Sequence, residues 1–362
     1  LLYGTEYQNT GNLDANLDKD AACTVCEVVD VGDTYVQWGR SDSCSNDHVT
    51  LYNGLVMATH YTQMKSEYVC VDARREQHAQ SDTSNSDGNL WYTTEAEGGS
   101  LDTTVYPQDV EVGCSMCRAP RSVYARWGSQ TCRAGSTLIY EGYVAGSHYQ
   151  HKGSGANTLC LHPQPQTPRG ASAGNQNGAL LYGTEYETTG VLDEQVDRDA
   201  ACAMCETDDV GDVYVQWGRS TNCSNGHTTL YSGLVMANHY TQQKSQFLCV
   251  DTERAQHDES DAADNNGNLL YTTETEAGSM DEFIYPHNME VGCSVCLSPT
   301  TPPSVAPTQS NPTRSPSQSP TLVPTTSPTH APIMSPTISP TTSPTTSPTT
   351  APTTSPTASP TT

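Results

Sequence analysis

The chain has 362 residues, of which 41 are acidic and 16 are basic, so its formal net charge is −25. Nucleic-acid phosphates repel a chain this acidic, which argues against a nucleic-acid partner and favours cations or basic surfaces. No apolar run reaches the roughly 18 residues that a bilayer-crossing helix needs, so the sequence predicts no membrane span.

The cysteine content points to a cross-linked protein. The chain contains 14 cysteines but only 2 phenylalanines, a composition typical of small cores that depend on disulfides. Disulfides form and persist in oxidising compartments. We therefore predict a secreted, extracellular protein.

Short segments rich in β-branched and aromatic residues, separated by Gly, Asn, Asp and Ser, predict an all-β fold. In chain order, the pattern allows a short helix at 19–26 (KDAACTVC), predicts a strand at 34–39 (TYVQWG) and allows a second short helix at 71–80 (VDARREQHAQ). Further strands are predicted at 137–144 (TLIYEGYV) and 282–286 (EFIYP).

The sequence contains an internal repeat. YVQWGR at 35–40 returns as YARWGS at 124–129 and as YVQWGR at 214–219. After each of these motifs come a cysteine, a His-Tyr pair, a second cysteine, a Leu-x-Tyr-x-Thr-Glu phrase and a CxxC motif. The period of about 90 residues predicts tandem β-repeats linked by disulfides.

Neighbouring repeats differ, whereas repeats two apart match closely. Residues 1–117 match 180–296 at an offset of 179, so we name the alternating repeats A and B halves. They are the first B half (35–117), the A half (124–205) and the second B half (214–296). The predicted regions are 1–118, a truncated first domain made of the end of an A half plus a B half; 119–297, a complete A–B domain; and 298–362, a tail.

On this interpretation, residues 1–26 are the end of a further A half. Its YxxWG portion is expected either in an unrecorded upstream segment, which typical domain lengths favour, or in another chain.

The CxxC motifs admit two interpretations besides structural disulfides. A thioredoxin-like redox motif starts a helix after a strand in a βαβ context, and VGCSMC and VGCSVC have no such context. Zinc could be held by Cys23 and Cys26 together with Cys114 and Cys117. Disulfides are favoured over zinc in an acidic, secreted chain.

All fourteen cysteines are predicted to form disulfides, under one of three pairing schemes. Bonding each CxxC to the next two single cysteines leaves Cys293 and Cys296 without partners, and bonding it to the two preceding single cysteines leaves Cys23 and Cys26 without partners. The favoured scheme satisfies every cysteine wherever the array is cut, although a missing upstream segment would revive the second scheme. The favoured bonds are Cys44–Cys70, Cys132–Cys160, Cys223–Cys249, Cys23–Cys26, Cys114–Cys117, Cys202–Cys205 and Cys293–Cys296.

From Pro299 the sequence consists mainly of Pro, Thr and Ser, with a proline at every fourth residue from 312 to 360. Proline excludes helix and breaks a sheet ladder, so we predict an extended polyproline II rod of roughly 200 Å. This composition is also typical of O-glycosylated stalks, whose glycans stiffen the rod; an unmodified linker is the alternative. The predicted positions of covalent O-glycans are Ser327, Thr329, Ser335, Thr337, Ser339, Pro340, Thr341, Thr342, Ser343, Pro344, Thr345, Thr346, Ser347, Pro348, Thr349, Thr350, Pro352, Thr353, Thr354, Ser355, Pro356, Thr357, Ser359, Pro360 and Thr361.

The His-Tyr pairs begin at His60, His148 and His239. None has a carboxylate or second histidine at a spacing shared by all three copies, and only the A half adds His151. We interpret them as structural histidines rather than metal ligands or general bases. Because GxSxG, HExxH and P-loop motifs are also missing, we predict that the protein is not an enzyme.

Calcium is the favoured ligand if the protein binds a metal. Two equivalent loops, 82–89 and 258–268, are rich in oxygen donors, although their spacing is not that of an EF-hand. The candidate calcium ligands are Asp82, Asp87, Asp261 and Asp264; solvated turn loops are the alternative. No other cofactor is predicted.

YARWGSQTC, GSHYQHKGSGANTLCL, LLYGTEYE, a CxxC, a second WGR half, FLCVD, NNGNLLYTTE and VGCSVC follow one another at 122–296. This order resembles the C-terminal noncollagenous domain of sponge short-chain (spongin-type) collagens and related invertebrate proteins, and 1–117 resembles a truncated second copy. The tail is similar to hydroxyproline-rich cell-wall glycoproteins and glycan-coated fibrils of algae and other aquatic organisms. The chain lacks the Gly-X-Y segment of collagens, so the resemblance implies an extracellular structural role but not collagen trimerisation.

These features predict a secreted structural glycoprotein, a subunit of an extracellular fibril or matrix. Its β-repeats would act as globular beads for assembly and its tail as a glycan-coated rod. The predicted partners are further copies of the protein and other extracellular matrix components, and a foreign strand could complete an exposed sheet edge. The alternative is a stalked adhesin or carbohydrate-binding module, with Trp127 and Trp217 as sugar platforms.

Overall fold

The computed structural model describes residues 2–8, 16–29, 31–81, 84–85, 88–168, 175–187, 195–260 and 263–299. The chain divides into two units, Leu1–Ser304 and Val305–Thr362, and the fold that follows is that of the first unit. The predicted O-glycan positions all lie outside the described residues.

The described residues of the first unit form an all-β fold, as predicted, with short 3₁₀ turns between strands. The strands are β1 (Thr5–Tyr7), β2 (Lys19–Asp20), β3 (Asp33–Trp38), β4 (Val49–Ala58), β5 (Val69–Asp72), β6 (Asn89–Ala96), β7 (Val110–Glu111), β8 (Gly113–Ala119), β9 (Val123–Trp127), β10 (Ser136–Gly146), β11 (Leu159–Leu161), β12 (Ala179–Tyr186), β13 (Arg198–Asp199), β14 (Ala201–Thr207), β15 (Gly211–Trp217), β16 (Thr228–Ala237), β17 (Leu248–Asp251), β18 (Asn268–Thr272) and β19 (Gly292–Pro299). The 3₁₀ helices are η2 (Ser45–Asp47) and η4 (Ser224–Gly226).

Two predicted strands are confirmed, since 34–39 lies mainly in β3 and 137–144 lies in β10. The segments 19–26 and 71–80 are not helical. In the second segment the Asp72 side chain accepts a hydrogen bond from the Arg74 N–H (2.8 Å), a local contact that favours a turn over a helix. No helix among the described residues has the length and apolar character needed to cross a membrane.

The strand predicted at 282–286 is wrong. The N–H groups of Ile284 and Tyr285 donate to the Asp281 carbonyl, and the Asp281 side chain accepts a bond from the Phe283 N–H (2.9 Å). Aspartate stabilises turns through such local bonds, so this aromatic run forms a turn and leaves Phe283 fully exposed.

The same three-stranded antiparallel sheet occurs in each half. A strand that carries the CxxC motif lies in the centre, the strand that ends at the tryptophan lies on one side, and a long strand lies on the other. We call them the CxxC strand, the Trp strand and the long strand. The triplets are β8 between β3 and β4 in the first B half, β14 between β9 and β10 in the A half, and β19 between β15 and β16 in the second B half.

The central position of the CxxC strand explains its burial. In the first B half Cys117 lies opposite Tyr35, and Cys114 lies opposite Trp38. Both cysteines are completely buried, because hydrogen-bonded strands flank β8 on both edges and side chains cover both of its faces. A strand buried on both faces shows no clean alternation of polar and apolar residues, as in GCSMCRA.

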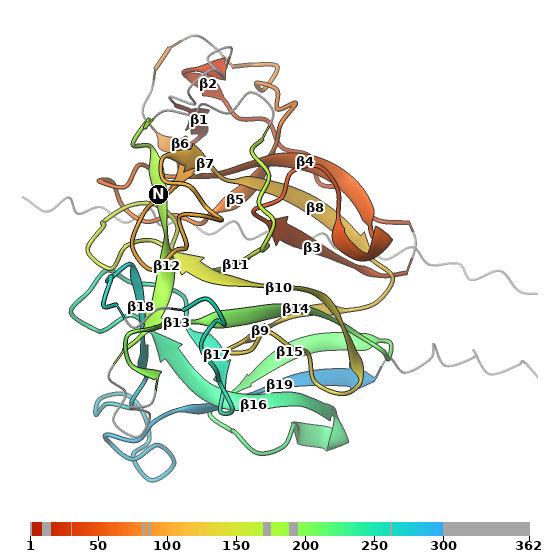
Figure 1. Ribbon diagram of the computed structural model, residues 1–362, viewed down its shortest axis with the longest axis vertical. Coiled ribbons are helices and arrows are strands. Elements are labelled where there is room, and N and C mark those ends of the chain that lie inside the picture. Colours follow the sequence, from red (N-terminus) through yellow and green to blue (C-terminus); the bar gives the residue numbers. More distant parts are fainter. Residues whose placement is uncertain are drawn as a thin grey trace, which may run out of the picture. The chain divides into compact units, whose positions relative to one another are not determined.

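Strand pairing also joins the halves to one another (Figure 1). β12 pairs in parallel with β6 through residues 179–181 and in parallel with β18 through residues 184–186. The short strand at the second single cysteine pairs with the end of the preceding Trp strand: β11 with β3 and β17 with β9. The three halves therefore form one continuous network of strands.

The hydrophobic core also extends through all three halves. One buried cluster contains Tyr35 of the first B half, Tyr140 of the A half and Met236 of the second B half. The core is therefore continuous across the boundary predicted at residue 118.

Candidate functional site

Six disulfides link the described residues, two in each half, and all three halves use the same pairing. The second cysteine of the CxxC bonds to the first single cysteine, and the first cysteine of the CxxC bonds to the second single cysteine. The bonds are Cys44–Cys117, Cys70–Cys114, Cys132–Cys205, Cys160–Cys202, Cys223–Cys296 and Cys249–Cys293, with Cα–Cα distances of 5.7 to 5.8 Å.

The predicted closure of these CxxC motifs on themselves is wrong, and so are the predicted bonds between single cysteines. Residues three apart on an extended strand are separated by about 10 Å and point to opposite faces, whereas a disulfide needs Cα atoms within roughly 7 Å. Each CxxC strand is extended, so its two cysteines must bond outward on opposite faces of the sheet. The observed bonds follow the second scheme, in which each CxxC bonds to the two preceding single cysteines.

This pairing excludes the zinc site predicted from Cys114 and Cys117, and it leaves the motifs VGCSMC and VGCSVC without free thiols for redox chemistry. Cys114 and Cys117 are buried and bonded, so they cannot join Cys23 and Cys26 around a metal ion. In each half the two bonds span 42 to 73 residues. A disulfide that closes a loop of this size typically contributes about 2–4 kcal/mol to stability.

Cys23 and Cys26 differ from the other twelve cysteines. Both are exposed, and neither has a disulfide partner among the described residues. Their predicted bond to each other does not form in this structure, where residues 22–29 are irregular chain that follows β2.

The variant C160S/C202S tests the structural role of these bonds. It removes one disulfide of the A half and should lower the free energy of unfolding by about 2–4 kcal/mol, measured by denaturant titration. The matched variant C23S/C26S removes two exposed thiols and should leave that free energy unchanged. Equal stability losses in the two variants would contradict the assignment.

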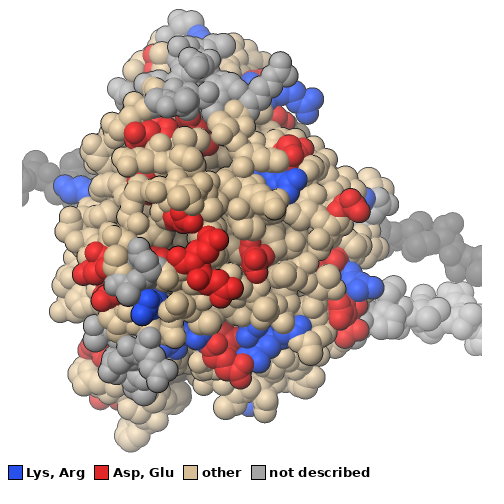
Figure 2. Space-filling view, in the orientation of Figure 1, with Lys and Arg blue, Asp and Glu red and all other residues tan. Residues whose placement is uncertain are grey.

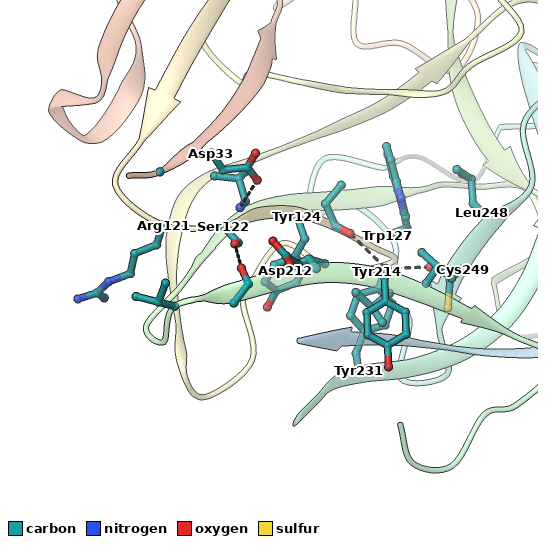
Figure 3. A pocket seen from close by; sticks show the side chains of 18 of the residues that line it. Asp33, Arg121, Ser122, Tyr124, Trp127, Asp212, Tyr214, Tyr231, Leu248 and Cys249 are labelled. Carbon is teal, nitrogen blue, oxygen red and sulfur yellow. Dashed lines mark hydrogen bonds between the residues drawn. The ribbon is translucent and has the colours of Figure 1, made fainter. Parts of the chain in front are cut away.

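A groove of about 610 Å³ lies between the A half and the second B half (Figure 3). Trp127 and Trp217, the two predicted sugar platforms, both line it. Trp217 is 49% exposed, and Trp127 is partly buried against the core. The structure therefore brings both candidate platforms to one site.

The floor of the groove is held in place by hydrogen bonds and ring packing. The Tyr231 ring stacks on that of Tyr124 at 6.3 Å between centroids, and the Tyr231 hydroxyl donates to the Cys249 carbonyl (2.9 Å). At the rim, the Asp33 carboxylate accepts a bond from the Val123 N–H (3.0 Å). These contacts hold Tyr124, Tyr231 and the start of β9 in place.

The polar rim of this groove was not predicted from the sequence. Asp33 begins β3 just before the first B half, Arg121 precedes the A half, and Asp212 lies in β15 just before the second B half. In Figure 3 the Arg121 side chain points away from the groove floor. Only the folded chain brings these residues together, and the recurring Trp-Gly motif is the one sequence signal for the site.

A buried ion pair between the A half and the second B half was also missed. The Arg126 guanidinium lies 2.7 Å from the Asp251 carboxylate, and Asp251 is completely buried. Arg133 lies 3.3 Å from the same carboxylate. A sequence signal was present, because the A half has Arg126 where the B halves have Gln37 and Gln216.

Two histidines of the A half pack against tyrosine rings. The His148 ring lies 4.8 Å from that of His151, and both rings contact Tyr182. Burial lowers the pKa of His151 to about 4, and the charges of the neighbouring His148 and Lys65 act in the same direction. Burial also lowers the pKa of Lys65 to about 8. Among the described residues, neither cluster of three potential metal-ligating side chains contains a histidine.

Two acidic clusters bear on the calcium prediction. Asp264 lies with Glu185 and Glu187, and their carboxylate oxygens are within 4.8 Å of one another. Asp82, Asp87 and Asp261 lie outside the described residues. The Glu185 carboxylate also accepts bonds from the N–H groups of Asn265 (3.0 Å) and Asn266 (2.9 Å), so it anchors this loop whether or not an ion is bound. Glu185, Glu187 and Asp264 are the described residues that could hold calcium, which stays a prediction.

The second acidic cluster consists of Glu95, Glu97 and Asp109. Glu95 accepts bonds from the N–H groups of Gln176 (2.6 Å) and Asn177 (3.0 Å). Burial, followed by the charges of Asp109 and Glu95, raises the pKa of Glu97 to about 7. The folded protein therefore holds a proton on Glu97 over a pH range in which the unfolded chain has lost it.

This proton makes stability depend on pH. As pH rises from about 4.5 to about 7 the unfolded state binds fewer protons than the folded state, so the free energy of unfolding falls. E97Q should remove this loss, and its stability relative to the wild type should improve by about 1–2 kcal/mol between pH 5 and pH 8. The control is E67Q, at a glutamate that is exposed. If the free energy of unfolding changed with pH in the same way for the wild type and E97Q, Glu97 would not be the origin of the pH dependence.

Acidic side chains are spread over the face shown in Figure 2, with the fewer basic side chains lying among or beside them and large uncharged areas between. No protein-family model matches the chain.

Proposed function

We propose that this protein is a secreted structural glycoprotein, a subunit of an extracellular fibril or matrix. The observation that carries the proposal is the pair of buried disulfides on the CxxC strand of every half. These bonds join the central strand covalently to segments on both sides, so pulling forces on a half are borne by covalent bonds as well as hydrogen bonds. Such a dense set of disulfides is typical of proteins that work in oxidising, extracellular surroundings.

In this proposal the first unit is a cross-linked bead and the tail is a rod. Prolines at every fourth residue favour an extended chain, and the Ser and Thr residues between them offer closely spaced attachment points for O-glycans. The bead has large uncharged surface areas (Figure 2), which suit contacts with further copies and with other matrix components. The role is mechanical rather than catalytic.

The rod is tested by the mass of the tail. Glycopeptide mass spectrometry of the secreted protein should show sugars at most of the Ser and Thr positions between 327 and 361, with additional mass on hydroxylated prolines. A tail fragment whose mass equals that of the bare polypeptide would contradict the glycan-coated rod.

A second candidate function is carbohydrate binding in the groove of Figure 3. The observation that favours it is the presence of Trp127 and Trp217 beside the carboxylates of Asp33 and Asp212. Aromatic faces pack against the apolar faces of sugar rings, and carboxylates accept hydrogen bonds from sugar hydroxyls.

A glycan array distinguishes this candidate from the first. If the groove binds sugar, W217A should abolish saturable binding to at least one glycan, because it removes the half-exposed platform. The control F283A removes an aromatic side chain that is fully exposed outside the groove and should bind like the wild type. Identical binding by W217A and the wild type would exclude the groove as the binding site.

A further inference from the structure

Two copies of the Leu-x-Tyr-x-Thr-Glu phrase are followed by an aspartate that the backbone holds in the same way. The Asp109 N–H donates to the Ala96 carbonyl (2.9 Å), and the Asp18 N–H donates to the Tyr7 carbonyl (2.8 Å). Both aspartates also adopt the left-handed conformation, with φ of 61° and 57°. The side chains around Asp109 and Asp18 can therefore be compared directly.

The carboxylate of Asp18 has a hydrogen-bond donor that Asp109 lacks. The Gln8 Nε2 donates to Asp18 Oδ1 (3.1 Å). The residue equivalent to Gln8 is Glu97, and an ionised carboxylate has no hydrogen to donate. Asp109 Oδ1 is buried and has no hydrogen-bond partner among the described residues.

Glu97 is itself a buried carboxyl group without a partner. It is 8% exposed and makes no side-chain hydrogen bond or ion pair within the described part of the chain. The charges that act on it are those of Asp109 and Glu95, and both are negative. The equivalent Glu276 has a partner, the His287 ring at 2.6 Å. Buried carboxylates are normally paired or bound to a metal, so the surroundings of Glu97 lack a positive group.

Glu97 and Asp109 meet a third carboxylate, that of Glu95. One oxygen from each of the three side chains lies within 4.8 Å of the others. Two oxygens that contact one calcium ion at 2.3–2.6 Å can be at most about 5 Å apart, so a single ion could reach all three. Glu95 accepts bonds from two backbone N–H groups, which orient its carboxylate while lone pairs remain for a cation.

The other acidic cluster, Glu185, Glu187 and Asp264, is different. Asp264 is exposed, Glu187 is only partly buried, and Asp264 Oδ1 accepts a hydrogen bond from the Asn266 side chain. A donor therefore already serves this second cluster. Glu187 is the A-half equivalent of Glu97, which makes it a matched position for comparison.

We propose that Glu95, Glu97 and Asp109 form a calcium site, separate from the predicted calcium loops at 82–89 and 258–268. All three ligands are carboxylate oxygens, which calcium prefers, and calcium tolerates irregular coordination that magnesium does not. Glu95 lies in β6, Glu97 directly follows this strand, and Asp109 directly precedes β7. The same stretch of β6 pairs with β12, so the ion stabilises the contact between the first B half and the A half.

Calcium and a proton compete for Glu97. The titratable groups around this carboxyl are Asp109, Glu95 and, from β12, the Tyr182 hydroxyl. A ligand carboxyl must lose its proton before it binds a metal ion. Because burial and the neighbouring acids raise the pKa of Glu97 to about 7, calcium affinity should rise about tenfold between pH 6 and pH 8.

Calorimetric titration of the chelator-treated full chain with calcium chloride tests the site. At about 0.15 M salt, which screens weak surface binding, the wild type should bind calcium at pH 8 and about tenfold more weakly at pH 6. E97Q should lose one bound ion per chain, or bind that ion at least about tenfold more weakly, with little pH dependence. Glutamine fits the fold at this position, as Gln8 shows.

The matched variant E187Q separates this site from the other acidic cluster. It should keep the ion that E97Q loses, with the wild-type pH dependence. The proposal would be overturned if the wild type bound no calcium, if E97Q bound it like the wild type, or if E187Q alone lost the ion. None of these outcomes would alter the proposed bead and rod, whose test is the glycosylation of the tail.

Discussion

Two cysteines three residues apart on an extended strand cannot bond to each other, and the architecture of this protein follows from that constraint. The side chains of Cys114 and Cys117 leave β8 on opposite faces, so their partners must come from two different segments. Cys44 lies just before the long strand, and Cys70 lies on β5. One short motif therefore fastens a three-stranded sheet covalently on both faces.

The same constraint governs how the halves meet. In every half the two strands that flank the CxxC strand come from sequence that precedes it. A half is therefore complete only when all three strands are present. The strand at the second single cysteine then pairs with the Trp strand of the preceding half, and the buried Arg126–Asp251 pair fixes that contact. A buried ion pair adds little net stability but discriminates strongly against a mismatched partner.

The sequence predicted the all-β class of the fold better than the contacts among the strands. The Trp motifs mark strands because their aromatic and β-branched residues favour extended chain, and the cysteines of all three halves pair in the same way. The disulfide pairing was mispredicted because the favoured scheme was the one that gave each of the fourteen cysteines a partner within the chain. The strand geometry of VGCSMC would have ruled out closure of that motif on itself. EFIYP has the composition of a strand but forms a turn. The backbone N–H groups of this segment donate to the carbonyl and side-chain oxygens of the preceding Asp281 and not to a neighbouring strand. The groove could not be predicted, since Asp33, Trp127 and Trp217 lie on three strands, β3, β9 and β15, that are far apart in the sequence.

The mechanical account depends most directly on the outward bonding of the CxxC strand. Tryptic digestion of the unreduced protein separates the relevant cysteines of the first B half into peptides 41–65, 66–74 and 76–118. The account predicts that mass spectrometry will find all three peptides joined in one species by two disulfides. Release of peptide 76–118 with an internal disulfide, together with 41–65 bonded to 66–74, would contradict it.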